Sequence, residues 1–150
     1  MNDQPVKHAL VGFPAAAIRF VQALERNREA IGHKHGLSPT DLRALFHIGE
    51  VVSLTPKQLA LHMEMTTGAI TAIATRLFNA GLVQRVDHPN DRRSLYLELS
   101  GQGHKLMVEI HRDFENMIAA ATEALTADEV VAFESALETV ADEVFSRMSA

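Results

Sequence analysis

Two adjacent arginines, Arg92 and Arg93, stand in a segment of turn-forming residues, His-Pro-Asn-Asp-Arg-Arg-Ser, at positions 88–94. The segments on either side, 82–86 and 95–99, are short and rich in strand-forming residues, so the sequence predicts a hairpin with a basic tip. Because a guanidinium group forms strong charge-assisted hydrogen bonds with phosphate, this tip is suited to contact a polyanion.

A second group of polar residues precedes the hairpin. Thr71 and Thr75 are four residues apart, and Thr66, Thr67 and Gly68 come shortly before them. A threonine offers a hydroxyl for hydrogen bonding and a methyl that can contact thymine. At the N-terminus of a helix, the free backbone N–H groups can also donate to phosphates. These residue types are therefore suited to contact a nucleic acid from the first turns of a helix.

The residues around these threonines have the periodicity of an amphipathic helix. The apolar side chains recur at i, i+3, i+4, i+7 and i+8, and they belong to Ile70, Ile73, Ala74, Leu77 and Phe78. Small and polar residues, the threonines among them, fall on the opposite face. Gly81 follows the last periodic residue, a position at which a left-handed residue commonly ends a helix. We therefore expect this helix to end near Ala80.

The rest of the chain supplies further helices around this helix and hairpin. Ser38, Thr55 and Thr126 each begin a helix-start signature. The predicted order is a helix over 7–34 that is kinked or restarted at Pro14, helices over 38–50, 55–63 and 66–80, the two strands, and two long helices from 105 and from 126. Residues 51–54 are a candidate edge strand. The fold class predicted is mainly α: a winged helix-turn-helix with long N- and C-terminal helices, about six helices plus a two- to three-stranded wing sheet.

The charge of the chain is divided unevenly along its length. The 150 residues carry a net charge of −5, which by itself disfavours a nucleic-acid partner. Residues 1–37 have a balance of +2, residues 38–105 of +1 and residues 106–150 of −8. Since charges are screened over roughly 8–10 Å at physiological ionic strength, an acidic C-terminal segment weakens phosphate binding elsewhere less than the total suggests. Cysteine is absent, which excludes disulfides and cysteine-ligated zinc.

The apolar stripes of the first helix and of the last two helices are longer than a small helix-turn-helix core can cover. The last stripe, for example, contains Phe133, Leu137, Val140 and Val144. A two-fold homodimer that buries more than roughly 2,000 Å² would cover these stripes. The alternative is a monomer whose long helices fold over its own core.

An uncharged run over residues 8–18 follows Lys7 and has some features of an export signal. It is too short to span a bilayer. It also contains Pro14 and continues directly into the periodic pattern of the first helix. We therefore expect no membrane partner and a cytoplasmic location.

The chain resembles the MarR-type bacterial transcriptional regulators, a family of homodimeric winged helix-turn-helix repressors. The most specific similarity is Asp91-Arg92-Arg93 followed by residues 97–103, Leu-Glu-Leu-Ser-Gly-Gln-Gly, which match the family's wing and the glycine-bearing helix start after it. The resemblance covers nearly the whole chain. It implies one domain over 1–150, with a winged-helix DNA-binding region at 37–103 and helical dimerisation regions at 1–36 and 104–150.

Double-stranded DNA is the partner that the resemblance implies, with one helix in the major groove and the wing in the adjacent minor groove. The candidates on this recognition helix are Thr66, Thr67, Gly68, Thr71, Thr75 and Arg76. The wing candidates are Asn90, Asp91, Arg92 and Arg93, of which Arg93, oriented by Asp91, would enter the minor groove while Arg92 contacts phosphate. Thr55 and Lys57 are further phosphate candidates.

Each assignment has a plainer alternative. Thr66 and Thr67 can serve as helix caps and nothing more, Arg76 can form a salt bridge to the wing instead of reading a base, and the two wing arginines can be a solvated turn.

The recognition helix also departs from the family pattern. Many relatives carry a basic residue at position 72 and around 79–80, and an acid at 75, where this chain has Ala72, Asn79, Ala80 and Thr75. We therefore expect DNA readout that depends on shape and threonine contacts more than on phosphate charge.

In the family, a small ligand, often an aromatic or phenolic acid, lodges between the dimerisation and DNA-binding parts and releases the DNA. By position, the candidate pocket residues here are Arg19, Phe20, Phe46, His47 and His111. The function expected is that of a regulator, a repressor of a pseudopalindromic operator that a small effector releases. For each pocket residue taken singly, an ordinary core or surface role is the alternative.

Other classes of function are less well supported by the sequence. A metal-responsive regulator would use histidine and carboxylate ligands, and the candidates for it are His33 with His35 and His104 with His111, joined by Glu109 or Glu115. No compact group of three ligands is evident, so no metal site is assigned. An enzyme is not expected, because the sequence shows no nucleophile beside a base and no phosphate-cradling loop; no cofactor is implied. A purely structural helical dimer would leave the basic hairpin without a role.

Overall fold

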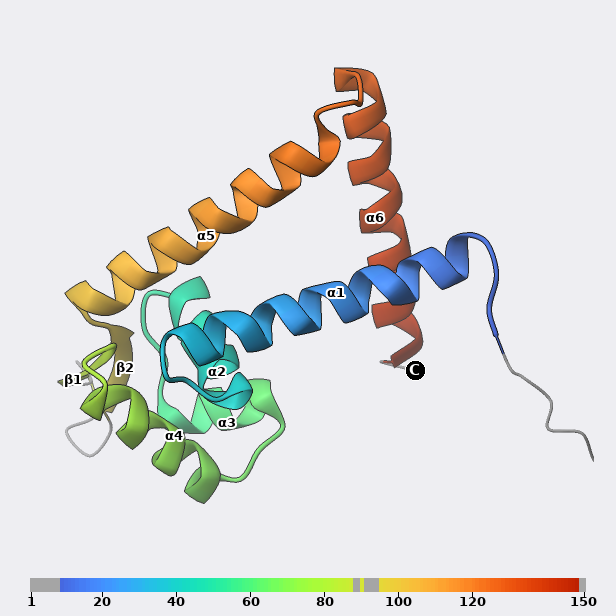
Figure 1. The fold of residues 1–150 in the computed structure, drawn as a ribbon. Helices are drawn as coiled ribbons and strands as arrows, with labels where there is room; N and C mark the ends of the chain where they lie inside the picture. Colours follow the sequence, from blue (N-terminus) through green and yellow to red (C-terminus); the bar gives the residue numbers. More distant parts are fainter. Residues whose placement is uncertain (1–8, 88–89, 91–94, 149–150) are drawn as a thin grey trace, which may run out of the picture. The chain divides into compact units, whose positions relative to one another are not determined.

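The computed structural model describes residues 9–87, 90 and 95–148 (Figure 1). These residues form six helices and one two-stranded antiparallel sheet. In chain order the elements are α1 (Phe13–Lys34), α2 (Pro39–Glu50), α3 (Pro56–Met63), α4 (Thr67–Asn79), β1 (Val83–Asp87), β2 (Leu95–Leu99), α5 (Gly101–Thr122) and α6 (Ala127–Met148). The chain divides into two compact units, residues 1–107 and residues 108–150. The predicted mainly α winged-helix fold is therefore confirmed.

Local sequence signals set most of the helix starts. The hydroxyls of Ser38, Thr55, Thr66 and Thr126 each accept a hydrogen bond from the backbone N–H three residues later. Such a cap satisfies one of the four N–H groups that the first turn of a helix leaves unpaired. At Thr55 and Thr126 the residue three positions on completes a capping box by accepting from the N–H of the threonine. The predicted capping sites are confirmed.

The first helix differs from the prediction. It begins at Phe13, and residues 9–12 lie outside it, so Pro14 occupies the second helical position. Proline is tolerated in the first turn, because the N–H that it lacks would have no partner there. The expectation of a helix that begins at residue 7 and is kinked at Pro14 was wrong. The other alternative, a helix start at Pro14, agrees with the structure to within one residue.

The core of the unit 1–107 is built around α2. Its fully buried side chains, Leu42, Leu45 and Ile48, pack with buried side chains from α3, α4 and β2, namely Leu59, Ile70, Ile73, Leu77 and Leu97. Fully burying one such aliphatic side chain is worth roughly 1.5–3 kcal/mol. Arg43 of α2 also donates from Nη2 to the Met63 carbonyl oxygen over 3.1 Å, which ties the end of α3 to α2. Helices α3 and α4 are thus held by a common neighbour.

The sheet lies directly after α4. Strands β1 and β2 pair in register from Val83 opposite Leu99 to Asp87 opposite Leu95. The predicted edge strand consists of a single bridge, in which Leu54 and Leu97 exchange both backbone hydrogen bonds. Gly81 has a φ of 73° and ends the α4 region as predicted.

Helix α5 begins four residues earlier than the predicted position 105. Its start is set by Ser100, whose hydroxyl accepts from the Gly103 N–H and donates to the Gly81 carbonyl. A side chain at Gly103 would collide with the Leu82 carbonyl oxygen. This glycine is therefore required by the close packing of the helix start against the strand.

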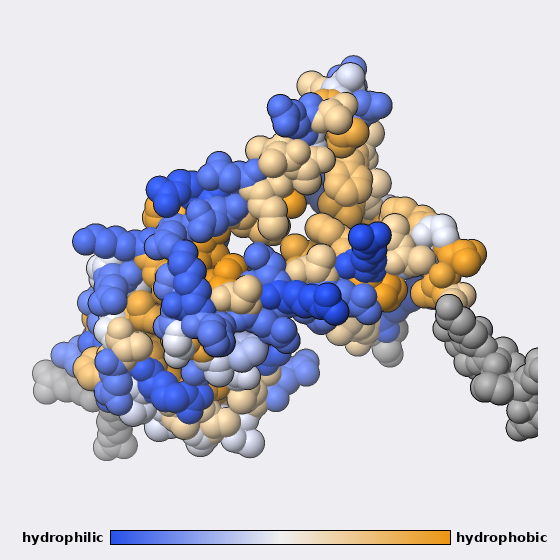
Figure 2. All heavy atoms as spheres, viewed as in Figure 1, coloured by the Kyte–Doolittle hydropathy of each residue, from blue (hydrophilic) through white to orange (hydrophobic). Residues whose placement is uncertain are grey.

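The unit 108–150 contrasts with this core. In α6 none of the described residues is buried, and Figure 2 shows apolar side chains, in orange and tan, along its surface. Its exposed large apolar residues are Val131, Phe133, Leu137, Val140, Val144, Phe145 and Met148. The helix start is set by its local sequence, and its apolar side chains remain exposed.

Candidate nucleic-acid interface

Helix α4 presents an uncharged face to solvent. Its buried residues are Ile70, Ile73, Ala74 and Leu77. The exposed residues on the other side are Thr67, Gly68, Thr71, Ala72, Thr75 and Asn79. There is no acidic residue in the first turn of α4, so no carboxylate of that turn neutralises the partial positive charge of its backbone N–H groups. This face can accommodate a closely approaching polyanion.

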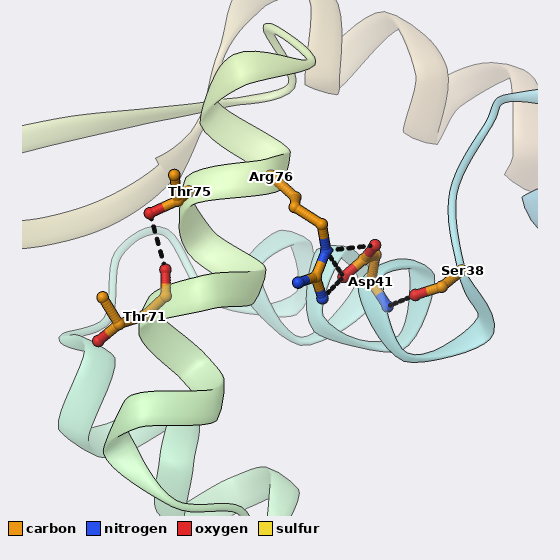
Figure 3. Close-up of polar contacts among 5 residues, drawn as sticks. All are labelled: Ser38, Asp41, Thr71, Thr75 and Arg76. Carbon is orange, nitrogen blue, oxygen red and sulfur yellow. Dashed lines mark hydrogen bonds and ion pairs between the residues drawn. The ribbon is translucent and has the colours of Figure 1, made fainter.

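The hydroxyls of Thr71 and Thr75 on this face are already engaged as donors, and Figure 3 shows the hydrogen bond between Thr75 and Thr71. Thr71 Oγ1 donates to the Thr67 carbonyl over 2.9 Å, and Thr75 Oγ1 donates to the Thr71 carbonyl over 2.8 Å. Each hydroxyl therefore offers solvent a lone pair and its neighbouring methyl group. Thr66 is the N-cap of α4, with its Oγ1 accepting from the Ala69 N–H over 3.2 Å, so its capping role is confirmed.

Arg76, on one flank of this face, is paired with Asp41 of α2 (Figure 3). Arg76 Nη2 lies 2.7 Å from Asp41 Oδ1, and Arg76 Nε donates to both carboxylate oxygens at 3.1 and 3.2 Å. The carboxylate is 5% exposed. Burial raises the pKa of Asp41, but hydrogen bonds from Arg76 and Ser38 outweigh burial and hold that pKa below its ordinary value.

We expected Arg76 to form a salt bridge to the wing. Its partner in the structure is instead Asp41. The carboxylate that binds Arg76 is 35 residues away, in the first turn of α2. The same hydrogen bond raises the pKa of the Arg76 guanidinium.

Arg85 of β1 contacts two residues of α4. Its guanidinium lies 5.0 Å from the centroid of the Phe78 ring, and its Nη2 lies 3.5 Å from Thr75 Oγ1. Phe78 was expected on the buried face, but it is 47% exposed. It lies at the edge of the apolar stripe, where it supports the cation by its ring face. The sequence analysis did not predict this role of Arg85. The available signal was Phe78, an aromatic residue at the edge of the apolar stripe of the helix, seven residues before Arg85 in the strand.

The remaining DNA-contact candidates are placed only in part. Thr55 and Lys57 lie at the start of α3, where Thr55 is engaged in its capping box and Lys57 is exposed. Asn90 is exposed. Asp91, Arg92 and Arg93 lie outside the described residues, so the wing assignments stay predictions.

The structure places the candidate pocket residues in both units of the chain. Arg19 and Phe20 on α1 and Phe46 and His47 on α2 belong to one unit, and His111 belongs to the other. His47 stacks on His62 of α3, with ring centroids 6.2 Å apart. An open groove of about 630 Å³, which sequence reasoning did not anticipate, lies where α1, the start of α2 and the turn after α3 meet; it is lined by Glu25, Arg28, Glu29, Pro39, Thr40, Arg43, Met63, Glu64 and Met65.

The metal-responsive alternative gains no support from the described part of the chain. Across residues 9–87, 90 and 95–148 there is no group of three or more histidine and carboxylate side chains that could hold a metal ion. Within the same residues, no helix combines the length and apolar character needed to cross a membrane.

Comparison with known proteins identifies the family of this chain. A family model described as the MarR family matches residues 35–94. The multiple antibiotic resistance protein MarR of Salmonella typhimurium is 31% identical over 110 residues, which is 69% of this chain and 76% of that protein. The chain belongs to the MarR family. It is thus a winged-helix DNA-binding transcription regulator and not an enzyme.

Two further similar proteins extend the comparison. The transcriptional repressor MprA of Escherichia coli is 28% identical over 127 residues, covering 83% of this chain and 70% of MprA. A crystal structure of NadR in complex with 4-hydroxyphenylacetate superposes with a TM-score of 0.63 at 25% identity, over 92% of this chain and 98% of NadR.

Proposed function

We propose that the protein is a homodimeric repressor that reads a pseudopalindromic operator with the exposed threonine face of α4 and releases the operator when it binds a small aromatic acid. The observation that carries the proposal is the composition of this face. It is small, uncharged and exposed from Thr67 to Asn79, and the helix is anchored on its other side by fully buried aliphatic side chains. Such a helix can enter the major groove as a rigid body.

Readout by α4 then depends on shape and methyl contacts. Thr71 and Thr75 donate to their own helix, so toward DNA they act as acceptors and present methyl groups, which suit cytosine amino groups and thymine methyls. The N-terminus of α4 is proposed to lie close to the DNA backbone, at Thr66, Thr67 and Gly68. Thr55 and Lys57 are proposed to contact phosphates, together with the wing residues Asn90, Asp91, Arg92 and Arg93.

The proposal of a homodimer rests on the exposed apolar stripes. Phe133, Leu137, Val140 and Val144 follow one face of α6 at spacings of four, three and four residues, and all are exposed in the single chain. A second copy would cover them by a two-fold contact. Residues 1–36 and 104–150 are proposed as the dimerisation regions, and residues 37–103 as the DNA-binding region. Two recognition helices related by a two-fold axis would bind half-sites about one helical turn apart.

Repression and effector release are proposed on two grounds. MprA is named a transcriptional repressor, and NadR binds 4-hydroxyphenylacetate, so both a repressor role and an aromatic acid are suitable hypotheses for this chain. Arg19, Phe20, Phe46, His47 and His111 are the proposed pocket residues. Release requires that the ligand bind more tightly to a conformation in which the recognition helices no longer match the half-sites.

A mobility-shift assay on the DNA that flanks the gene for this protein tests the proposal. Thr71→Ala and Arg93→Ala are each expected to lower specific affinity by roughly 1–3 kcal/mol. Thr139→Ala is the matched control, because Thr139 is an exposed α6 threonine whose hydroxyl makes the same hydrogen bond to a carbonyl four residues earlier. If neither of the first two variants differs from the Thr139 control, the DNA-contact assignments are wrong.

The effector is tested in the same assay by adding 4-hydroxyphenylacetate or salicylate over the micromolar to millimolar range. The expected result is loss of the shifted band at concentrations that leave the dimer intact. A shift that is insensitive to a panel of aromatic acids would contradict that part of the proposal.

A further inference from the structure

We propose that Asp41 is a positioning residue for DNA recognition: by gripping Arg76, it fixes the rotation of α4 about its own axis and thereby the direction in which the threonine face points. The inference rests on the proposed use of α4 as the recognition helix. Asp41 itself is buried and does not touch DNA.

The two flanks of the threonine face are held by different elements. Successive residues of an α-helix are about 100° apart, so Arg76 and Phe78, two positions apart, lie on opposite flanks of the exposed face. Arg76 is bound to α2 through Asp41, and Phe78 is covered by Arg85 of β1. A rotation of α4 in either direction would lengthen one of these two contacts.

The Arg76–Asp41 pair adds a directional restraint to the apolar packing that anchors α4. The buried side of α4 is formed by Ile70, Ile73, Ala74 and Leu77, and aliphatic contacts are not directional. The Arg76–Asp41 contact is directional, because two guanidinium nitrogens meet the carboxylate and fix its plane. A binding site has to be held within about 10–20° of its productive geometry, which is the range that such a contact can control.

The energetics also favour a positioning role. Asp41 is 5% exposed, while the Arg76 side chain is 54% exposed. The cost of removing the carboxylate from water offsets much of the attraction to its partner, so a pair of this kind adds little net stability. The pair also occupies Nε and Nη2 of Arg76, the one basic residue within α4, so its positive charge is directed at the protein.

The first test compares specific and non-specific affinity. Asp41→Asn keeps the size of the side chain and one acceptor oxygen but removes the charge. We expect the affinity for the operator to fall roughly tenfold, the size of losing one specific contact, while the affinity for a random duplex of equal length stays within about twofold because phosphate contacts are retained. A role in folding alone would instead lower both affinities together.

Two further variants keep the test decisive if Asp41→Asn folds poorly. The first is Arg76→Lys, which retains the charge but loses the two-nitrogen contact with the carboxylate. It should lower the affinity for the operator and leave the affinity for the random duplex unchanged. The second is the double variant Asp41→Asn with Arg76→Gln. Arg76 Nε lies within 3.2 Å of both carboxylate oxygens of Asp41. The Nε2 of a glutamine is the same number of bonds from the backbone as Arg76 Nε, so it can donate to the side chain at position 41. This neutral pair should restore the specificity ratio toward that of the parent.

The matched control is Glu143→Gln, which removes an arginine fork of similar geometry on α6, where Arg147 Nε and Nη2 lie 2.7 and 2.6 Å from Glu143 Oε1. We expect no change in either affinity. If Arg76→Lys and Asp41→Asn both keep the parental ratio of specific to non-specific affinity, the positioning role of Asp41 is wrong. If the parent shows no specific binding, or Thr71→Ala has no effect on it, the proposed function itself fails, which is a separable outcome.

Discussion

The two units of the chain handle apolar side chains in opposite ways. In the unit 1–107, aliphatic residues of α2, α3, α4 and β2 are fully buried around one another. In the unit 108–150, α6 is as long as α1 and carries a regular apolar stripe, yet none of its described residues is buried. The first unit therefore contains its own core and can hold a site in fixed geometry. The second unit exposes the apolar stripe that we propose as the dimer interface.

The largest expected effect comes from the core of the first unit. Leu45→Ala should lower the free energy of unfolding by about 2–5 kcal/mol, because it leaves a cavity beside the other buried aliphatic side chains. Urea denaturation followed by circular dichroism measures it. Val131→Ala, at an exposed position of α6, is the control and should change stability by less than about 0.5 kcal/mol. Equal effects of the two variants would contradict the contrast between the units.

The next effect concerns the second unit. Phe133→Asp should weaken self-association by at least roughly 100-fold, because a carboxylate placed in an apolar interface loses its hydration without gaining a partner. Sedimentation equilibrium over a range of concentrations measures the shift from dimer to monomer. Val131→Asp carries the same new charge on the opposite side of the helix and should leave the dimer intact. A Phe133→Asp protein that stays dimeric would show that this stripe is not the interface.

A smaller effect follows from the lowered pKa of Asp41. A carboxyl group whose pKa is lower in the folded state stabilises the fold fully above its ordinary value of 3.8, and this stabilisation is lost as the pH falls through the folded-state pKa. The stability difference between the parent and Asp41→Asn should therefore be largest near neutral pH and should shrink on acidification below about pH 4. Urea midpoints at pH 7 and pH 3.5 measure it. A difference that is constant with pH would contradict the lowered pKa of Asp41 in the folded state.

Much of the fold could be predicted because it depends on neighbours in sequence. The caps at Ser38, Thr55 and Thr126, the end of α4 before Gly81 and strand β2 were all read from residues within a few positions of one another. Such features are local, so tertiary structure does not have to be known.

The features that were missed depend on packing between distant segments. Asp41 was read as an acid in a first helical turn, and nothing in periodicity connects it with Arg76. Phe78 has the spacing of a core residue, but its position at the stripe edge is decided by how β1 returns past α4 with Arg85. Helical periodicity predicts which side of a helix is buried. Tertiary contacts determine whether a residue at the edge of that side is buried or exposed.

We propose that a two-fold dimer reads DNA with the threonine face of α4. Hydroxyl-radical footprinting on the DNA that flanks the gene tests it most directly. We expect two protected blocks centred about 10 base pairs apart, both lost together in Thr71→Ala and both kept in Thr139→Ala. A single protected block, or two blocks that are unchanged in Thr71→Ala, would contradict it.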